Sequence, residues 1–96
     1  MQVTVVIDPR DGDGEWQITK EFELSYIPSI GAMIRTTKVG EYLEVTDVFL
    51  TLDANTCVVY AGTDVEQARW YFRDDDGWQI VNDPSGRGAK ELSRPP

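Results

Sequence analysis

The sequence contains no histidine and only one cysteine, Cys57. A single cysteine cannot form a disulfide within the chain, which favours a reducing compartment. Its position among valines predicts a buried, unreactive thiol. The absence of histidine excludes Ser-His-Asp and Cys-His catalysis and removes the commonest zinc ligand. Carboxylate pairs could still do acid–base chemistry, but nothing in the sequence places two of them in a pocket, and so small a domain has little room for a substrate cavity. We therefore predict a protein that is not an enzyme and that uses no cofactor.

Basic residues and long apolar runs are also scarce. Nine Lys and Arg stand against seventeen Asp and Glu, which gives a net charge of −8. Surfaces that bind the phosphate backbone of nucleic acids or anionic membranes need clustered Lys and Arg, so neither is expected as a direct partner. No apolar run has the length of a membrane span, and the chain opens without a charged-then-apolar signal segment. These features predict a soluble, cytoplasmic protein.

The sequence does contain a β-rich pattern, and its longest part is residues 41–62. Val, Tyr, Phe, Leu and Thr dominate both halves of this stretch, which predicts a long β-hairpin. Asp-Ala-Asn at residues 53–55 fits a three-residue loop with Asn55 in the left-handed conformation. The resulting cross-strand pairs are Leu50 with Val58 and Phe49 with Val59. Both faces of the predicted hairpin are apolar, so both need cover.

The first arm of this hairpin changes its apolar face partway along. Leu43 and Val45 point one way, whereas Val48 and Leu50 point the other way in a strand of period two. This switch predicts a bulge or a sharp bend in a strand that serves two sheets.

Further strands are expected over residues 2–8, 15–24, 33–38 and 77–81. The second of these has the cleanest alternation of apolar and polar residues, which indicates an antiparallel sheet with one solvent-exposed face. Between the last two, Thr63 and Glu66 have the form of a capping box for a helix over residues 64–73. Val65, Ala68 and Phe72 recur there at helical spacing. We expect this helix to cover the outer Phe49–Val59 face of the hairpin.

The predicted fold is mostly β with one helix. Sequential strands with short connections favour an antiparallel meander. We expect residues 1–82 to form a single domain, a small, partly open antiparallel β-barrel of SH3-like or related type. It has five or six strands and a helix near the C-terminus. Residues 83–96 are rich in Pro, Gly, Ser and charge, which predicts a disordered tail.

Part of the chain, residues 22–48, carries a recognisable pattern. FELSYIPSIGAMI is followed by GEYLEVTDV, so that a strand precedes Pro-x-x-Gly-x-x-Ile and then a second Tyr- and Val-containing strand. This pattern resembles that of small uncharacterised bacterial and phage-associated β-barrel proteins. The resemblance implies a barrel fold and a bacterial accessory or mobile-element setting. It brings no catalytic residues.

The acidic and glycine-rich loop after the first strand is one candidate site. Alternating acidic residues between glycines can gather oxygen ligands around Ca²⁺. The candidate ligands are Asp8, Asp11, Asp13 and Glu15. The further ligands of a full calcium loop are missing, so these residues are better explained by turn geometry, and no metal is expected.

Two other groups of residues are candidates for binding a partner. The aromatic group is Trp16, Tyr26, Trp70, Tyr71 and Trp78. Exposed rings of this kind hold Pro-rich peptides in SH3-type barrels, although packing of the core is the alternative use. Trp70 lies off the apolar helical stripe and is the first choice for an exposed ring. The acidic group is Glu21, Glu23, Glu41, Glu44, Asp74, Asp75 and Asp76. It could imitate a phosphate backbone, or it could simply keep a β-rich protein solvated.

These patterns favour a non-enzymatic protein-interaction module that acts as a monomer or weak homodimer. Its partner is expected to be a protein, of basic character if the acidic surface takes part. Two alternatives remain open. One is an acidic inhibitor that mimics nucleic acid and occupies a basic protein, and the other is a small-ligand-binding barrel.

Overall fold

A computed structural model of the chain describes residues 1–10 and 16–93. Within them the strands are β1 (Gln2–Pro9), β2 (Gln17–Glu23), β3 (Met33–Ile34), β4 (Leu43–Thr51), β5 (Thr56–Thr63) and β6 (Gln79–Val81). The helices are α1 (Val65–Asp74) and α2 (Arg87–Leu92). Each predicted strand is present, although β3 and β6 are shorter than expected. The prediction of a small, mostly β protein is confirmed.

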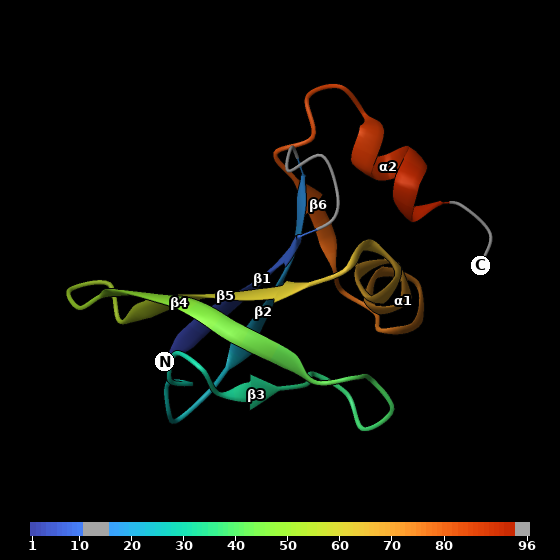
Figure 1. Cartoon of the computed structure of the whole chain (residues 1–96). Helices are drawn as coiled ribbons and strands as arrows, with labels where there is room; N and C mark the ends of the chain where they lie inside the picture. The colour runs from blue at the N-terminus through green and yellow to red at the C-terminus, as the bar shows by residue number, and fades with distance from the viewer. Residues whose placement is uncertain (11–15, 94–96) are drawn as a thin grey trace.

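The described strands form one open, six-stranded sheet in the order β3-β4-β5-β1-β2-β6 (Figure 1). The sheet does not close into a barrel, and it is not the predicted antiparallel meander throughout, because β1 and β5 run parallel. The apolar sequence of β1 explains its central place. Val3, Val5, Val6 and Ile7 are all buried, so β1 has apolar residues on both faces and gains most by lying between two strands.

The predicted hairpin is formed by β4 and β5, but its register is shifted by one residue. Leu50 lies opposite Cys57, and Phe49 lies opposite Val58. Thr51 pairs with Thr56, so the loop comprises residues 52–55 and not 53–55. Asn55 has the expected left-handed conformation, with φ of 53°. The prediction of a three-residue loop is wrong. Apolar residues occupy both faces of the hairpin, so the sequence pattern is equally compatible with a register shifted by one residue.

A bulge between Val45 and Asp47 interrupts β4, as predicted. It does not send the strand into a second sheet. Val45, Val48 and Leu50 lie opposite Ala61, Val59 and Cys57. These β5 residues alternate along one buried face of their strand, so the bulge brings both apolar sets of β4 onto that same face.

Helix α1 covers the core face at the end of the hairpin away from its loop (Figure 1). Its N-cap is Asp64, whose carboxylate accepts a hydrogen bond from the backbone N–H of Gln67 at 2.7 Å, and not the predicted Thr63. The residues of α1 that it buries are Val65, Ala68 and Tyr71. The Tyr71 hydroxyl donates to the Glu41 carbonyl.

The predicted position of this helix over the outer face of the hairpin is wrong. Phe49 on that face remains 59% exposed. Phe72, which was expected on the buried stripe, is only half-buried. Tyr71 is buried instead of Phe72, so the buried face of α1 differs by one residue from the predicted face. The hairpin loop therefore projects away from both helices (Figure 1).

Helix α2 lies within the stretch that was predicted to be a disordered tail, and that prediction is wrong for residues 87–92. Leu92 is fully buried in the core cluster. The guanidinium of Arg73 donates to the Leu92 carbonyl at 3.0 Å, which ties α2 to α1. Gly88 lies directly on Trp16, where a Cβ would approach the indole within 2.6 Å. Composition alone missed this helix because its docking depends on a few specific long-range contacts, among them Leu92, Gly88 and the Arg73 hydrogen bond.

Candidate protein-interaction surface

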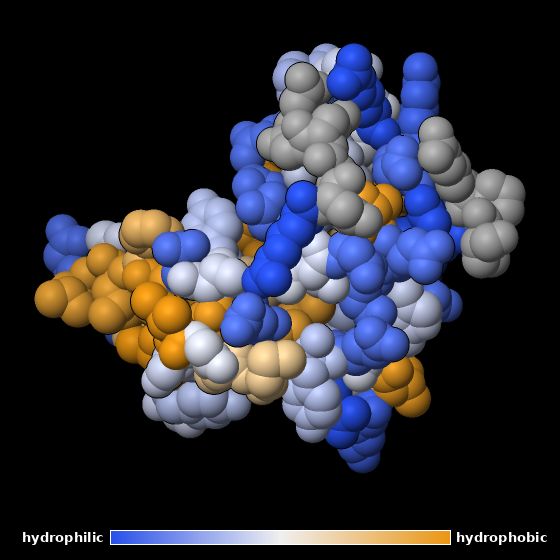
Figure 2. All heavy atoms as spheres, in the orientation of Figure 1, coloured by the Kyte–Doolittle hydropathy of each residue, from blue (hydrophilic) through white to orange (hydrophobic). Residues whose placement is uncertain are grey.

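The loop end of the β4–β5 hairpin exposes large apolar side chains. Phe49 is 59%, Leu50 48% and Leu52 83% exposed. We call these three residues the hairpin surface. Figure 2 shows hydrophobic residues gathered over this end of the hairpin, in contrast to the mainly hydrophilic surface near the helices. Neighbouring exposed apolar residues of this size are typical of binding sites.

The hairpin surface extends over both faces of the sheet. Leu50 is on the core face beside Val48. Val48 still packs against the core cluster, whereas Leu50 is about half exposed among the described residues. Phe49 is on the outer face, where its ring meets that of Tyr60 edge-on at a centroid distance of 5.7 Å. Leu52 belongs to the loop. Exposed apolar side chains thus lie on both faces of the hairpin and in its loop.

The backbone of β4 is also unpaired along this part of the strand. On one side, residues 47–51 pair with β5. On the other side, β3 reaches only Leu43 and Glu44, and the preceding residues Gly31 and Ala32 bond to Val45. Past Val45, no strand in the described part of the chain pairs with this edge of β4. Asp47 is the sole charged residue of that edge, so it lacks the lysines and prolines that usually protect edge strands.

The hairpin and its flanks carry charge of one sign. Residues 39–68 contain no Lys or Arg. Their acidic residues are Glu41, Glu44, Asp47, Asp53, Asp64 and Glu66. Glu44 pairs with Arg10 at 3.1 Å, whereas Asp47 and Asp53 are exposed and form no ion pair within the described residues. The loop end is therefore both apolar and negatively charged.

The predicted aromatic site is not assembled on one surface. Trp16 is 2% and Trp78 7% exposed, so both serve the core and offer no ring to a partner. Tyr71 is likewise buried. Tyr26 is 68% exposed. Trp70 is half-buried, with its ring edge-on to Tyr71 at 5.1 Å. Tyr26 and Trp70 thus remain the candidates of this group.

Each of these two aromatic residues lines a small hollow. The hollow beside Trp70 has about 400 Å³ and lies along α1, with Arg69 and Arg73 in its wall. Both guanidiniums already donate to backbone carbonyls of α2, so they serve the contact between the helices. The hollow beside Tyr26 has about 180 Å³, and Phe22, Pro28 and Ile34 line it. Its volume is below that of an ordinary ligand pocket.

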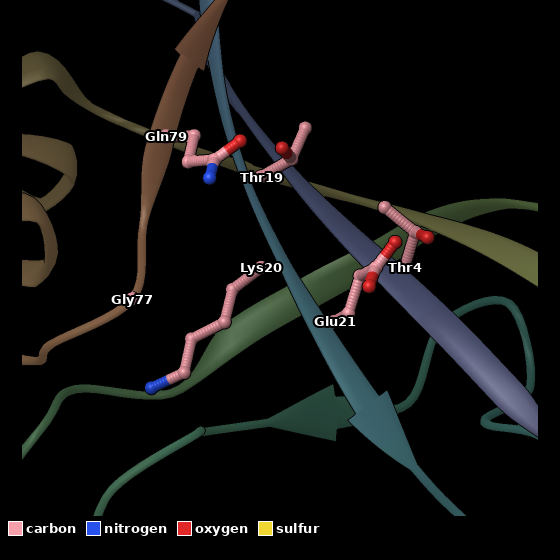
Figure 3. A pocket seen from close by; sticks show the side chains of 6 residues that line it. All are labelled: Thr4, Thr19, Lys20, Glu21, Gly77 and Gln79. Carbon is pink, nitrogen blue, oxygen red and sulfur yellow. The ribbon is translucent and has the colours of Figure 1, made fainter.

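A third hollow, of about 350 Å³, lies over β1, β2 and the start of β6 (Figure 3). Its lining is polar and comprises Thr4, Thr19, Lys20, Glu21, Gly77 and Gln79. The Lys20 ammonium points away from Thr4 and Glu21 (Figure 3). That ammonium is instead paired with Asp75. Lys20, the one cation among the described lining residues, is therefore already engaged and is not free to bind an anionic ligand.

The predicted acidic run divides into two kinds of residue. Asp74 and Asp76 are exposed. The Asp75 carboxylate instead accepts hydrogen bonds from Lys20 Nζ at 3.0 Å, Thr36 Oγ1 at 2.8 Å and Trp78 Nε1 at 2.9 Å. It thereby joins β2 to the segment after β3, two parts of the open sheet that share no ladder. We call this junction between β2 and the segment after β3 the seam. Asp75 is a structural residue of the seam and is not available to imitate a phosphate.

The electrostatics of the seam follow from these contacts. Burial would raise the pKa of Asp75, but the hydrogen bonds from Lys20, Trp78 and Thr36, with the charge of Lys20, outweigh it and hold the pKa below its usual value. Among the other predicted acidic residues, Glu23 pairs with the N-terminal amine and Glu21 accepts from Gln2. The charge of Glu23 is thus offset locally, whereas the neutral Gln2 amide leaves the charge of Glu21 in place.

Of the candidate calcium ligands, Asp11, Asp13 and Glu15 lie outside the described residues. Asp8 belongs to β1. Within the described part of the chain, no three carboxylate or thiol side chains come together as metal ligands.

Comparison with known proteins gives no relative for this arrangement. No protein-family model, curated protein or solved structure matches the chain. Of the helices in residues 1–10 and 16–93, none combines the length and apolar character needed to cross a bilayer.

Proposed function

We propose that this chain is a non-enzymatic protein-interaction module that binds its partner through the hairpin surface. The observation that carries the proposal is the exposure of Phe49, Leu50 and Leu52 next to an unpaired strand edge. Burying one such side chain completely is worth about 1.5–3 kcal/mol. A partner that covers the three would gain several times the thermal energy, enough for specific binding once the costs of association are met.

Affinity capture from the source cell tests this proposal. The test variant is Phe49→Thr, Leu50→Thr and Leu52→Thr together, because threonine keeps the strand propensity while removing the apolar surface. The matched control is Val39→Thr with Tyr42→Thr, two exposed apolar residues outside the hairpin surface. Thermal melts first establish that both variants fold. A partner retained by the control and lost by the triple variant supports the proposal, and a partner that the triple variant retains refutes it.

An acidic mimic of nucleic acid is the second candidate, and the charge of residues 39–68 favours it. The structural role of Asp75 and the local pairing of Glu23 and Glu44 weaken it. A mimic complex depends on exposed charge, so its affinity falls steeply with salt. Replacing Asp74 and Asp76 with Asn would then weaken binding while the apolar triple variant would not. A small-ligand-binding barrel has less support, since the sheet is open, the hollow beside Tyr26 is small, and the cations that line the other two hollows are already engaged.

We also propose that the protein works in a reducing compartment such as the cytoplasm. Its one cysteine, Cys57, is 1% exposed in β5, and burial raises the pKa of the thiol. Such a thiol reacts poorly in any compartment, so the support for a reducing one is the lack of a second cysteine for a disulfide within the chain. The bacterial, mobile-element setting implied by the pattern in residues 22–48 stays a prediction.

A further inference from the structure

We infer that the partner binds as an added β-strand along residues 47–51 of β4, through an extended segment in which apolar residues alternate with Lys or Arg. This inference rests on the proposed function and specifies the chemistry of the partner. It draws on three features of the hairpin: the unpaired edge, the different character of its two faces, and the sign of its charge.

The edge already binds an extended segment of the chain itself. The Val45 N–H donates to the Ala32 carbonyl at 2.9 Å, and the Gly31 N–H donates to the Val45 carbonyl at 2.8 Å. This short ladder stops at a turn, in which the Ala32 N–H bonds to the Ser29 carbonyl and Gly31 has a φ of 88°. Positive φ at glycine directs the chain out of the strand path. An added strand would continue the ladder along the part of β4 that this turn leaves unpaired.

The two faces of this edge call for two kinds of side chain. Val48 and Leu50 lie on the core face, and Asp47 and Phe49 lie on the outer face. Neighbouring residues of an added strand would alternate between these faces. Apolar side chains on the core face would cover Leu50. A Lys or Arg on the outer face would pair with Asp47, and it could lie over the Phe49 ring in a cation–π contact.

The charge of the hairpin selects a basic partner over a second copy of this chain. Residues 39–68 supply carboxylates and no cation, so a copy docked at this edge would bring Asp47 and Asp53 near another acidic hairpin. The net charge of −8 on each molecule adds to this repulsion. A segment with alternating Lys or Arg instead offsets the charge of Asp47 on this edge and lowers the overall negative charge of the hairpin.

A synthetic peptide tests the inference on the full chain. The probe is a capped, labelled peptide in which four Val alternate with four Arg, and its matched control has Glu in place of Arg. We expect the Arg peptide to bind at least about tenfold more tightly than the Glu peptide, because only the former offsets the hairpin charge. Asp47→Asn should weaken binding of the Arg peptide several-fold at low salt and much less at about 1 M salt, where screening is nearly complete.

Amide hydrogen exchange separates strand addition from side-chain contact. Bound peptide should slow exchange at one or more amides of residues 47–51 by at least about tenfold, because those N–H groups gain partners. Amides of β6, on the opposite edge, provide the internal control. The inference is overturned by failure of the Arg peptide to bind, by equal binding of the two peptides, or by binding without protection in residues 47–51. These outcomes concern the peptide alone, so they leave the proposed function standing if the captured partner still requires the hairpin surface.

Sedimentation of the chain without peptide tests whether a second copy of the chain occupies the β4 edge. We expect a monomer at concentrations of tens of micromolar, because two acidic hairpins repel each other. A dimer that the Phe49→Thr, Leu50→Thr and Leu52→Thr variant abolishes would identify a second copy as the occupant and would refute the basic strand.

Discussion

Replacing Asp75 with Asn would test how much one carboxylate contributes to holding the open sheet together. Asp75 receives hydrogen bonds from Lys20 in β2, from Thr36 after β3, and from Trp78 before β6. Its side chain is 13% exposed and that of Lys20 21%, so solvent screens the ion pair only weakly. The substitution preserves the shape of the side chain and removes its charge.

The expected cost follows from the hydrogen bonds that the substitution breaks or weakens. Asparagine keeps one acceptor oxygen and replaces the other with an NH₂ donor, so at least one of the three donors loses its partner. The remaining bonds become neutral acceptor bonds. A hydrogen bond to a charged group contributes about 1.5–3 kcal/mol and a neutral one about 0.5–1.5 kcal/mol. We expect Asp75→Asn to lower the free energy of unfolding by about 2–3 kcal/mol.

The assay is urea denaturation followed by tryptophan fluorescence, with Asp76→Asn as the matched control. Asp76 is exposed and adjacent in the chain, so its substitution should change stability by no more than about 0.5 kcal/mol. An Asp75→Asn variant as stable as the Asp76→Asn control would refute the reasoning, because it would show that the seam does not depend on the carboxylate.

The pH dependence provides a second test. Because the pKa of Asp75 is lowered in the folded state, the folded protein takes up this proton less readily than the unfolded chain, in which an aspartate has a pKa of about 3.9. The stabilisation by Asp75 is thus fully present above this value and is lost as the pH falls through the folded pKa. The difference between the wild type and Asp75→Asn should shrink below about pH 4. An unchanged difference between neutral and acidic pH would contradict the assignment.

Three further predictions concern the fold. Tyr71→Ala should cost about 3–5 kcal/mol in urea denaturation and half-buried Phe72→Ala only about 1–2 kcal/mol, whereas equal losses would mean that the phase of α1 is different. Gly88→Ala should lower stability by about 1–3 kcal/mol, since the new Cβ would press on Trp16, and an unchanged thermal midpoint would show that α2 does not dock there. Asn55→Val should cost about 1–2 kcal/mol at its left-handed φ while Asn55→Gly is tolerated, and the reverse order would contradict the loop conformation.

The hairpin illustrates what the sequence could and could not predict. Strand-forming residues and the switch of apolar face after Val45 predicted both the hairpin and the bulge, because each depends on local alternation. The predicted register depended on the assumed loop length. Because both faces of the hairpin are apolar, the alternation could not distinguish the true register from one shifted by one residue. The parallel pairing of β1 with β5 joins segments far apart in the chain, which no local pattern reports.

The candidate site shows a second limit. Both faces of the hairpin were predicted to need cover, and the sequence contained one clear helix to provide it. The structure uses that helix at the other end of the hairpin, so that Phe49 and Leu52 stay exposed. The mismatch between two apolar faces and a single ten-residue helix was the available signal. Asp75 could not be separated from Asp74 and Asp76, since its three partners come from different parts of the fold.

The parallel pairing of β1 and β5 also bears on how the chain acquires its structure. β1 begins at residue 2, but its partner β5 begins only at residue 56. During synthesis β1 can pair with β2 early. The other edge of β1 stays unpaired until β5 has been synthesised, which requires more than half of the chain. Contacts of such sequence separation slow folding, because the intervening chain must be ordered first. Val3, Val5 and Ile7 would remain open to other chains during this interval, so expression at low temperature or with a chaperone should raise the yield of native protein.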